Sequence, residues 1–223
     1  MRFVHPEYHL DIKMAENQIT IVVVESPQVF ADVIQEIFAQ IQGKEGLFVL
    51  SDRDKTITIS KEAEMIFHPF ALNCNEKRMQ QKLYQAVSAV AEEEFVSETV
   101  EINAHVVSYL DELLAKLPYG LTFELEMNVS GLLKLYAVRV ECSAENLLEQ
   151  VVNYLRCLQT FCHTAVVFFV NLKTYLNESE LLLLYQFVYC NKIQVILLEN
   201  MQREPLQGEN ICILDKDMCI IES

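Results

Sequence analysis

Glycine and proline are scarce in this sequence, with five of each among 223 residues, and no segment is of low complexity. Disordered chains are usually poor in apolar residues, whereas 52% of this sequence is hydrophobic. The composition therefore predicts a chain that is globular throughout. Its length allows one sizeable domain, or one domain that carries a large insertion.

Long apolar runs are also lacking. The longest ones fall far short of the roughly 18 consecutive apolar residues that a membrane-spanning helix needs. Residues 1–6 lack the apolar core of a signal peptide. We therefore expect a cytoplasmic protein with no membrane contact.

The sequence offers no metal, redox or catalytic motif built on cysteine or histidine. The seven cysteines are odd in number and none are spaced C-x-x-C, so we expect reduced, buried thiols that act as small apolar side chains. No H-E-x-x-H motif is present, and His5 and His9, although four residues apart, lie in the N-terminal segment and form no pair suited to zinc. No serine or cysteine lies in a G-x-S-x-G turn. We predict no catalytic residue.

Basic residues are outnumbered, with 17 Lys and Arg against 32 Asp and Glu, which gives a net charge of −15. The acidic excess is concentrated in residues 92–126, where Lys116 is the only basic residue. The acidic residues there are Glu92, Glu93, Glu94, Glu98, Glu101, Asp111, Glu112, Glu124 and Glu126. Since phosphate binding depends on Lys and Arg, composition alone argues against a nucleic-acid partner. A solvated outer face is the simplest explanation of the acidic segment.

Residues 164–199 form the centre of the predicted fold. Residues 165–170 are six consecutive apolar residues, which is typical of a strand buried on both faces in a parallel sheet. Asn177, with Glu180 three residues later, predicts the start of a helix. Residues 193–198 predict a second strand. Strand, helix and strand make a right-handed crossover unit, and the fold class is therefore α/β.

The N-terminal part predicts further elements of the same domain. Residues 1–18 predict an edge strand or hairpin, and residues 19–24 predict another central strand. Ser26 and Pro27 then begin a helix, as N-cap and first helical residue, and Gly43 ends it. Further strands are predicted at residues 47–50, 56–59 and 65–70, with a terminal hairpin at residues 211–221.

A helical block interrupts the strands. From Asn75 to about Leu117 there is no strand pattern and no Pro or Gly, and two apolar stripes predict two long helices or one with a break near Ser97. We interpret the block as an insertion. Residues 1–72 and 137–223 would form an α/β head, and residues 73–136 would form a helical leg.

The step from the first central strand into its helix is where nucleotide-binding α/β proteins carry a phosphate loop. Such a loop needs glycines whose backbone N–H groups surround phosphate, and a lysine. Residues 25–28 read Glu-Ser-Pro-Gln, with neither Gly nor Lys. Glu199, at the end of another strand, imitates the acid that holds magnesium in such enzymes. Without a phosphate loop we expect Glu199 to be a solvated strand end, and we predict no nucleotide site.

Glu124 and Glu126 are the best candidates for metal ligands. Because they are two residues apart in a segment expected to be extended (residues 121–127), their carboxylates would share a face, with Asn128 next in the row. Calcium prefers several oxygen ligands at once, and Asp111 or Glu112 could supply more by folding back. Ordinary surface acids are the alternative.

The densest basic cluster is Lys77, Arg78 and Lys82, at the start of the helical block. Lys134 and Arg139 lie where the chain leaves the block. If the helical stretches lie side by side, all five could meet at its root. A solvated basic face is the plainer alternative.

Several of these segments together resemble a known family, the Csn accessory proteins of type II-A CRISPR systems, which act in spacer acquisition. The likeness spans nearly the whole chain and is one of pattern, since no catalytic motif defines the family. It lies in residues 19–30 (ITIVVVESPQVF), 47–52 (LFVLSD), 65–75 (MIFHPFALNCN), 166–204 (VVFFVNLKTYLNESELLLLYQFVYCNKIQVILLENMQRE) and 210–215 (NICILD).

The resemblance implies an α/β head, similar to the Rossmann-like head of P-loop ATPases but without the phosphate loop, and an inserted helical leg. It implies a ring-shaped homotetramer that binds the ends of double-stranded DNA without sequence specificity, through lysines that line the hole. It also implies bound calcium that supports the ring, no enzymatic activity, and CRISPR integrase proteins and an effector nuclease as partners in this antiviral defence. The run FELEMN (residues 123–128) falls where the family has its calcium-binding acids, although Met127 and Asn128 replace expected acids.

The leading hypothesis is therefore a non-enzymatic, calcium-dependent protein that binds DNA ends. Its predicted metal ligands are Glu124, Glu126 and Asn128, and its predicted DNA contacts are Lys77, Arg78, Lys82, Lys134 and Arg139. Two alternatives stay open: a degenerate nucleotide hydrolase that uses Glu199 or Asn171, and a scaffold that binds only proteins.

Overall fold

The protein is described by a computed structural model that covers residues 1–53 and 55–222, without the side chain of residue 222. The chain divides into two compact units. Met1–Asn73 and Cys142–Ser223 form the head, and Cys74–Glu141 form the leg. The inserted unit is thus the helical block, and each unit is described by itself below.

A six-stranded sheet in the order β10-β9-β3-β8-β7-β6 forms the centre of the head. Its strands are β3 (Ile19–Val24), β6 (Ala63–Ile66), β7 (Val166–Val170), β8 (Gln194–Glu199), β9 (Glu209–Leu214) and β10 (Ile220–Glu222). Neighbouring strands run parallel, except that β10 is antiparallel to β9. All six residues of β3 are buried, as its unbroken apolar run predicts. The α/β fold class, including the terminal hairpin, is therefore confirmed.

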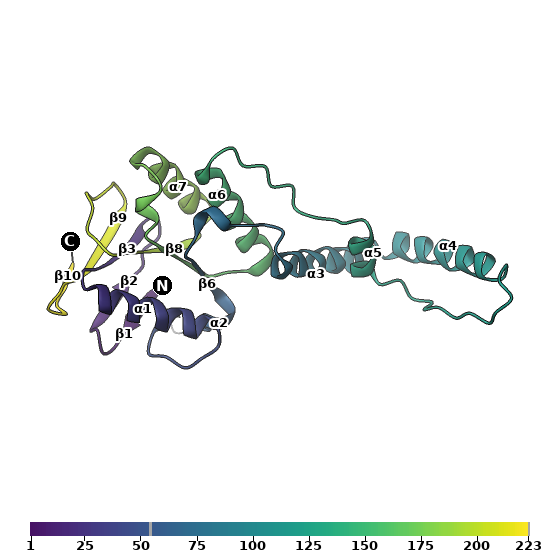
Figure 1. Ribbon diagram of the computed structural model, residues 1–223, viewed down its shortest axis with the longest axis horizontal. Coiled ribbons are helices and arrows are strands. Elements are labelled where there is room, and N and C mark those ends of the chain that lie inside the picture. Colours follow the sequence, from purple (N-terminus) through teal and green to yellow (C-terminus); the bar gives the residue numbers. More distant parts are fainter. Residues whose placement is uncertain (54, 223) are drawn as a thin grey trace. The chain divides into compact units, whose positions relative to one another are not determined.

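Helices cover both faces of this sheet (Figure 1), with α1 (Pro27–Ile41) on one side and α6 (Leu147–Cys157) and α7 (Glu178–Cys190) on the other. The predicted starts are confirmed: Ser26 caps α1, and Asn177 caps α7 in a capping box with Glu180. Asn146 caps α6. Shorter helical segments are α2 (Ile59–Glu62), η1 (Pro69–Ala71), η2 (Leu158–Cys162) and η3 (Leu172–Thr174).

The head contains a second, antiparallel sheet in the order β2-β1-β4-β5. Its strands are β1 (Arg2–His5), β2 (Leu10–Lys13), β4 (Val49–Asp52) and β5 (Lys55–Ile57), and the pairing of β1 with β2 confirms the N-terminal hairpin. One apolar cluster joins both sheets and α1. Within it, the rings of Phe3 in β1 and Phe168 in β7 are 5.5 Å apart, and Ile37 of α1 is fully buried.

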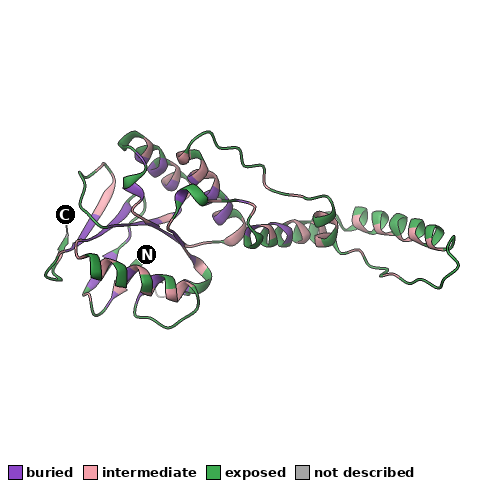
Figure 2. Ribbon diagram, in the orientation of Figure 1, coloured by how far each residue is buried: buried purple, intermediate pink, exposed green. Residues whose placement is uncertain are grey.

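The leg consists of α3 (Lys77–Glu94), α4 (Val96–Leu114) and α5 (Val129–Leu135). The predicted break between the long helices falls at Phe95. α3 buries Met79, Leu83 and Tyr84, whereas no residue of α4 is buried (Figure 2). Residues 121–127, expected to be extended, contain no strand; within this described segment the chain bends at Leu125 and Glu126.

No helix within the described part of the chain is both long enough and apolar enough to cross a membrane.

Candidate functional site

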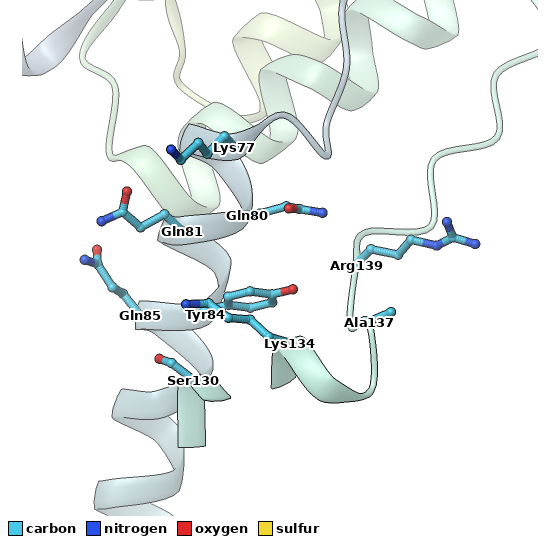
Figure 3. A pocket seen from close by; sticks show the side chains of 9 residues that line it. All are labelled: Lys77, Gln80, Gln81, Tyr84, Gln85, Ser130, Lys134, Ala137 and Arg139. Carbon is cyan, nitrogen blue, oxygen red and sulfur yellow. The ribbon is translucent and has the colours of Figure 1, made fainter. Parts of the chain in front are cut away.

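A cavity of about 650 Å³ lies within the leg, bordered by α3, by α5 and by the segment after α5 (Figure 3). Three of the five predicted DNA contacts line this leg cavity: Lys77, Lys134 and Arg139. The other lining residues are Gln80, Gln81, Tyr84, Gln85, Ser130 and Ala137. Among these described lining residues none is acidic, although the chain carries a net charge of −15.

Hydrogen bonds hold the walls of the leg cavity in place. The Asn75 side-chain amide donates to the Val140 carbonyl at 2.9 Å, and its oxygen accepts from the Val140 N–H at 2.8 Å. The Tyr84 hydroxyl donates to the Val138 carbonyl at 3.0 Å. These bonds fasten residues 138–140, which are an extended segment with no sheet partner of their own, along α3. They therefore carry Arg139 to the cavity rim.

The helical period of α3 decides which of its basic residues line the cavity. At about 100° per residue, Arg78 and Lys82 lie roughly 100° and 140° around the helix from Lys77. Neither lines the cavity, and both are exposed on the adjoining face of α3. The five predicted DNA contacts are therefore not one group in the structure.

The three basic side chains that line the leg cavity do not all point the same way. Figure 3 shows the Lys134 side chain crossing α3 towards the side on which Lys77, Gln81 and Gln85 project. In the same view the Arg139 guanidinium points away from α3. Lys77 and Lys134 thus lie on the same side of α3, and Gln81 and Gln85 lie between them along the helix.

The predicted calcium ligands form no cluster of three acidic, His or Cys residues within the described part of the chain. Glu124 and Glu126 are exposed, and their oxygens are the hard donors that calcium prefers. Among the described residues, no third His, Cys, Asp or Glu lies close enough to them to form a ligand cluster. Two carboxylates leave most positions around calcium to water or to another chain, because the ion takes 6 to 8 oxygens.

Asn128 serves the backbone instead. It is the N-cap of α5, and its Oδ1 accepts a hydrogen bond from the Gly131 N–H at 3.0 Å. An N-cap position needs a side-chain oxygen such as that of Asn, which explains the residue without a metal. Of the three predicted ligands, Glu124 and Glu126 fit the ion and Asn128 does not.

The turn between β3 and α1 cannot hold a phosphate. The Ser26 hydroxyl accepts the Val29 N–H at 3.5 Å as the helix cap, and Pro27 occupies the first turn of the helix. The N–H of Glu25 is bonded to the Leu214 carbonyl at 3.0 Å. The backbone donors that a phosphate loop would offer are therefore missing or used.

Glu199 is buried, with 1% of its surface exposed, and the expectation of a solvated strand end was wrong. Its Oε1 accepts the Lys173 N–H at 3.0 Å, while Oε2 has no partner within the described part of the chain. Burial raises the pKa of Glu199 to about 7, against the lowering effect of that N–H and of the charges of Lys173 and Arg203. This side chain is therefore sealed inside the head.

A buried ion pair lies beside Glu199, and sequence reasoning missed it. The Lys173 Nζ donates to both oxygens of Glu209, at 2.7 and 2.9 Å, and the Tyr185 hydroxyl donates to Glu209 at 2.6 Å. Burial is also the main cause that raises the pKa of Tyr185 far above its usual range. Each charged group has its partner here, so the cluster serves the stability of the head.

The second residue proposed for a hydrolase, Asn171, has a backbone role. It adopts a left-handed conformation with φ of 54°, and its Oδ1 accepts the Asn200 N–H at 3.1 Å. Asn tolerates this conformation better than most residues. Asn171 thus joins the chain segments that follow β7 and β8.

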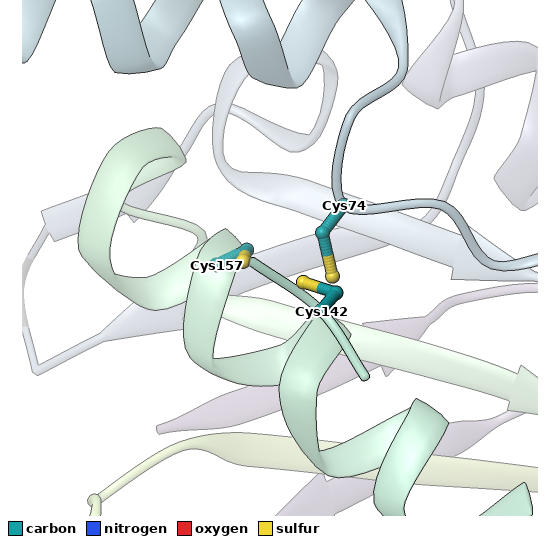
Figure 4. Close-up of side chains that lie close together, drawn as sticks. All are labelled: Cys74, Cys142 and Cys157. Carbon is teal, nitrogen blue, oxygen red and sulfur yellow. The ribbon is translucent and has the colours of Figure 1, made fainter. Parts of the chain in front are cut away.

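None of the seven cysteines, all of which lie in the described part of the chain, forms a disulfide bond. Cys74, Cys157 and Cys212 are buried as expected, but Cys142, Cys190 and Cys219 are exposed, so that part of the expectation was wrong. Figure 4 shows three of them: Cys74 at the start of the leg, and Cys142 and Cys157 of the head.

Comparison with known proteins gives a matching family model and a set of solved structures that the chain is similar to. The family model described as "CRISPR-associated protein (Cas_Csn2)" matches residues 40–218. No curated protein matches the chain. The solved structures that it is similar to include the dimeric structure of a post-hydrolysis state of the ATP-binding cassette MJ0796 bound to ADP and Pi, with 8% sequence identity, coverage of 92% of this chain and 84% of that chain, and a TM-score of 0.39.

Proposed function

The chain belongs to the Cas_Csn2 family of CRISPR-associated proteins, and from this premise we propose that it binds the ends of double-stranded DNA in the cytoplasm during spacer acquisition. In this proposal the protein is a ring-shaped homotetramer, depends on calcium and has no enzymatic activity. It acts together with the CRISPR integrase proteins and the effector nuclease. The observation that supports DNA binding best is the leg cavity, with three cationic residues and no acid among its described lining residues.

Electrostatics explains why such a protein would need several basic surfaces at once. At −15 per chain, a tetramer carries about −60 and repels a duplex at long range. Four leg cavities that converge on one duplex would replace this repulsion with close contacts to phosphate. Arg78 and Lys82, on the adjoining face of α3, would add contacts outside the cavity. Such contacts carry little sequence preference.

Calcium would act through charge. Bound to Glu124 and Glu126, the ion supplies two positive charges to the acidic part of the leg. Its remaining positions would be filled by water or by a second chain. Replacing both residues by Gln should therefore weaken the response to calcium and leave the fold of the head unchanged.

Exposed apolar side chains on α4 support assembly through the leg. Val100, Tyr109 and Leu113 are 63%, 63% and 48% exposed, although isolated helices seldom keep so many apolar groups in water. Light scattering in calcium should give about four times the 25.8 kDa chain mass. A monomer under these conditions would contradict the ring.

Gel shifts with linear and covalently closed circular duplexes test the DNA proposal. We expect linear DNA to bind in calcium, to bind more weakly in EDTA, and to dissociate steeply as salt rises. Closed circles should bind poorly, because threading needs an end. Equal binding of both forms would contradict the end requirement, and no binding of either would remove the proposal.

Matched variants locate the contact. Lys77→Ala combined with Lys134→Ala should weaken duplex binding by about tenfold or more, since charged hydrogen bonds to phosphate are lost. The control, Lys44→Ala combined with Lys61→Ala, removes the same charge from exposed positions of the head. Equal effects in the two double variants would show that only net charge matters.

The hydrolase alternative has little support, because residues 25–28 offer no phosphate cradle and Glu199 is sealed. ATP turnover above background that is lost in Glu199→Ala would favour that alternative.

A further inference from the structure

The size of the leg cavity limits what can enter it. At about 650 Å³ it falls within the range of roughly 300–1,000 Å³ that small-molecule sites occupy. An intact duplex is too wide for such a cavity and could touch only its rim. One nucleotide, with its phosphate, sugar and base, is of a size to go inside.

The lining of the cavity has two kinds of polar group. Lys77 and Lys134 supply positive charge at the two ends of the cavity, and they come from different helices. Gln80, Gln81 and Gln85 supply three amides, all from α3. An amide offers two donors and an acceptor, which complement the mixed donors and acceptors on the edge of a base. Amides can also donate to phosphate, but only a base edge uses both their donors and their acceptor.

The remaining wall is fixed and less polar. Tyr84 is 8% exposed, and its hydroxyl is held by the Val138 carbonyl at 3.0 Å, so its ring cannot swing away. The Ser130 hydroxyl lies 3.1 Å from that of Ser88 and ties α5 to α3. The cavity is thus built before any ligand arrives, which lowers the cost of ordering on binding.

We propose that the leg cavity binds one phosphorylated nucleotide, with the phosphate on Lys77 at the start of α3, the base against the amides of Gln81 and Gln85, and Lys134 at the far edge of the base. Figure 3 supports this pairing, since these four side chains lie towards the same side of α3. The inference rests on the proposed function in one respect: the unpaired terminal nucleotide of a DNA end is one source of the ligand. A free nucleotide is the other source.

Titration calorimetry of the full chain with small probes tests the site without DNA. The probes are deoxyadenosine monophosphate, deoxyadenosine and inorganic phosphate. We expect the monophosphate to bind about tenfold more tightly than either part, because the cavity holds both parts at once. Equal binding of the monophosphate and inorganic phosphate would overturn the proposal, because it would show a phosphate surface with no role for the amides.

Single variants with a matched control locate the bound probe. Lys77→Gln and Lys134→Gln should each weaken the monophosphate by about tenfold. Gln81→Ala combined with Gln85→Ala should weaken the binding of the monophosphate but not the binding of inorganic phosphate. Lys116→Gln, an exposed lysine elsewhere in the leg, should change neither. If Lys116→Gln weakens binding as much as Lys77→Gln, the effect is one of general charge and the site is wrong.

Two duplexes distinguish the sources of the nucleotide. One is blunt, and the other carries a short single-stranded overhang with a 5′-phosphate. Tighter binding of the overhang duplex, lost in Lys77→Gln, assigns the cavity to DNA ends. Equal binding of the two duplexes, with monophosphate binding intact, assigns it to free nucleotides. If duplex binding fails entirely while the monophosphate binds, the proposed function is wrong and the nucleotide site stands.

Discussion

Glu199 is the residue whose charge should respond to pH near neutrality. Its carboxyl group titrates near 4.5 in the unfolded chain and near 7 in the folded head, because burial opposes its charged form. The stability that this shift contributes is therefore fully present below pH 4.5 and is lost as pH rises through 7.

We expect the free energy of unfolding of the natural chain, relative to Glu199→Gln, to fall by roughly 2 to 3 kcal/mol between pH 5 and pH 8. Gln keeps the shape and the acceptor for the Lys173 N–H but cannot ionise. Urea denaturation at the two pH values measures the difference, with Glu204→Gln, an exposed neighbour, as control. A difference that does not change with pH would mean that Glu199 is charged throughout.

The ion pair of Lys173 and Glu209 should be sensitive to the loss of one partner. Lys173→Met leaves a buried carboxylate without its cation, which costs about 3 to 5 kcal/mol of stability. Adding Glu209→Gln removes the unpaired charge and should recover part of the loss. Thermal denaturation of the single and double variants measures both effects. Equal stability of the single variant and the double variant would show that Glu209 finds another partner when Lys173 is replaced.

These residues also mark the limit of what the sequence could predict. Lys173 and Glu209 are 36 positions apart, and neither belongs to a local pattern, so only the fold reveals their pairing. Glu199 follows four consecutive apolar residues and precedes a polar loop, which is equally typical of a buried and of an exposed strand end. The position of Glu199 was therefore predicted correctly and its burial was not.

At the scale of elements, prediction succeeded where periodicity and caps are local. Ser26 and Asn177 mark helix starts because an N-cap is a contact across three residues. Prediction failed for residues 121–127, where alternating acids suggested an extended face and the chain bends at residues 125 and 126 instead. The sequence grouped five basic residues at the root of the helical block, and three of them, Lys77, Lys134 and Arg139, line the leg cavity. Arg78 and Lys82 do not line it, because the helical period of α3 places them on an adjoining face.

The two hydrogen bonds between Asn75 and Val140 should decide whether the segment after α5 stays on α3. Asn75→Ala removes both bonds, and we expect a loss of about 2 kcal/mol in the stability of the leg. Hydrogen exchange should accelerate at residues 138–140 more than in α4. Asn103→Ala, which breaks a bond to the Leu125 carbonyl elsewhere in the leg, is the control. Unchanged exchange at residues 138–140 would contradict the role of Asn75.

At the scale of the whole molecule, the alternation of strands and helices was enough to predict an α/β domain with an inserted helical unit. In the structure the chain returns to the head at Cys142, whereas the sequence predicted a return at residue 137. The reason lies in Val138 and Val140, whose apolar pattern suggests a strand of the head but whose hydrogen bonds go to Tyr84 and Asn75 in the leg.

The central position of β3 also has a consequence for folding during synthesis on the ribosome. β3 emerges early, yet both of its neighbours come late, β8 from Gln194 and β9 from Glu209. Pairing of such distant segments is slow, and the apolar β3 must wait unpaired while the leg is being made. In a nascent chain stalled after residue 192, β3 should therefore be sensitive to protease. In a chain stalled once residue 223 is outside the exit tunnel, β3 should be protected. Protection at the earlier point would mean that β3 first pairs elsewhere. During that interval the nascent head exposes an unpaired apolar strand, which is the kind of segment that aggregates.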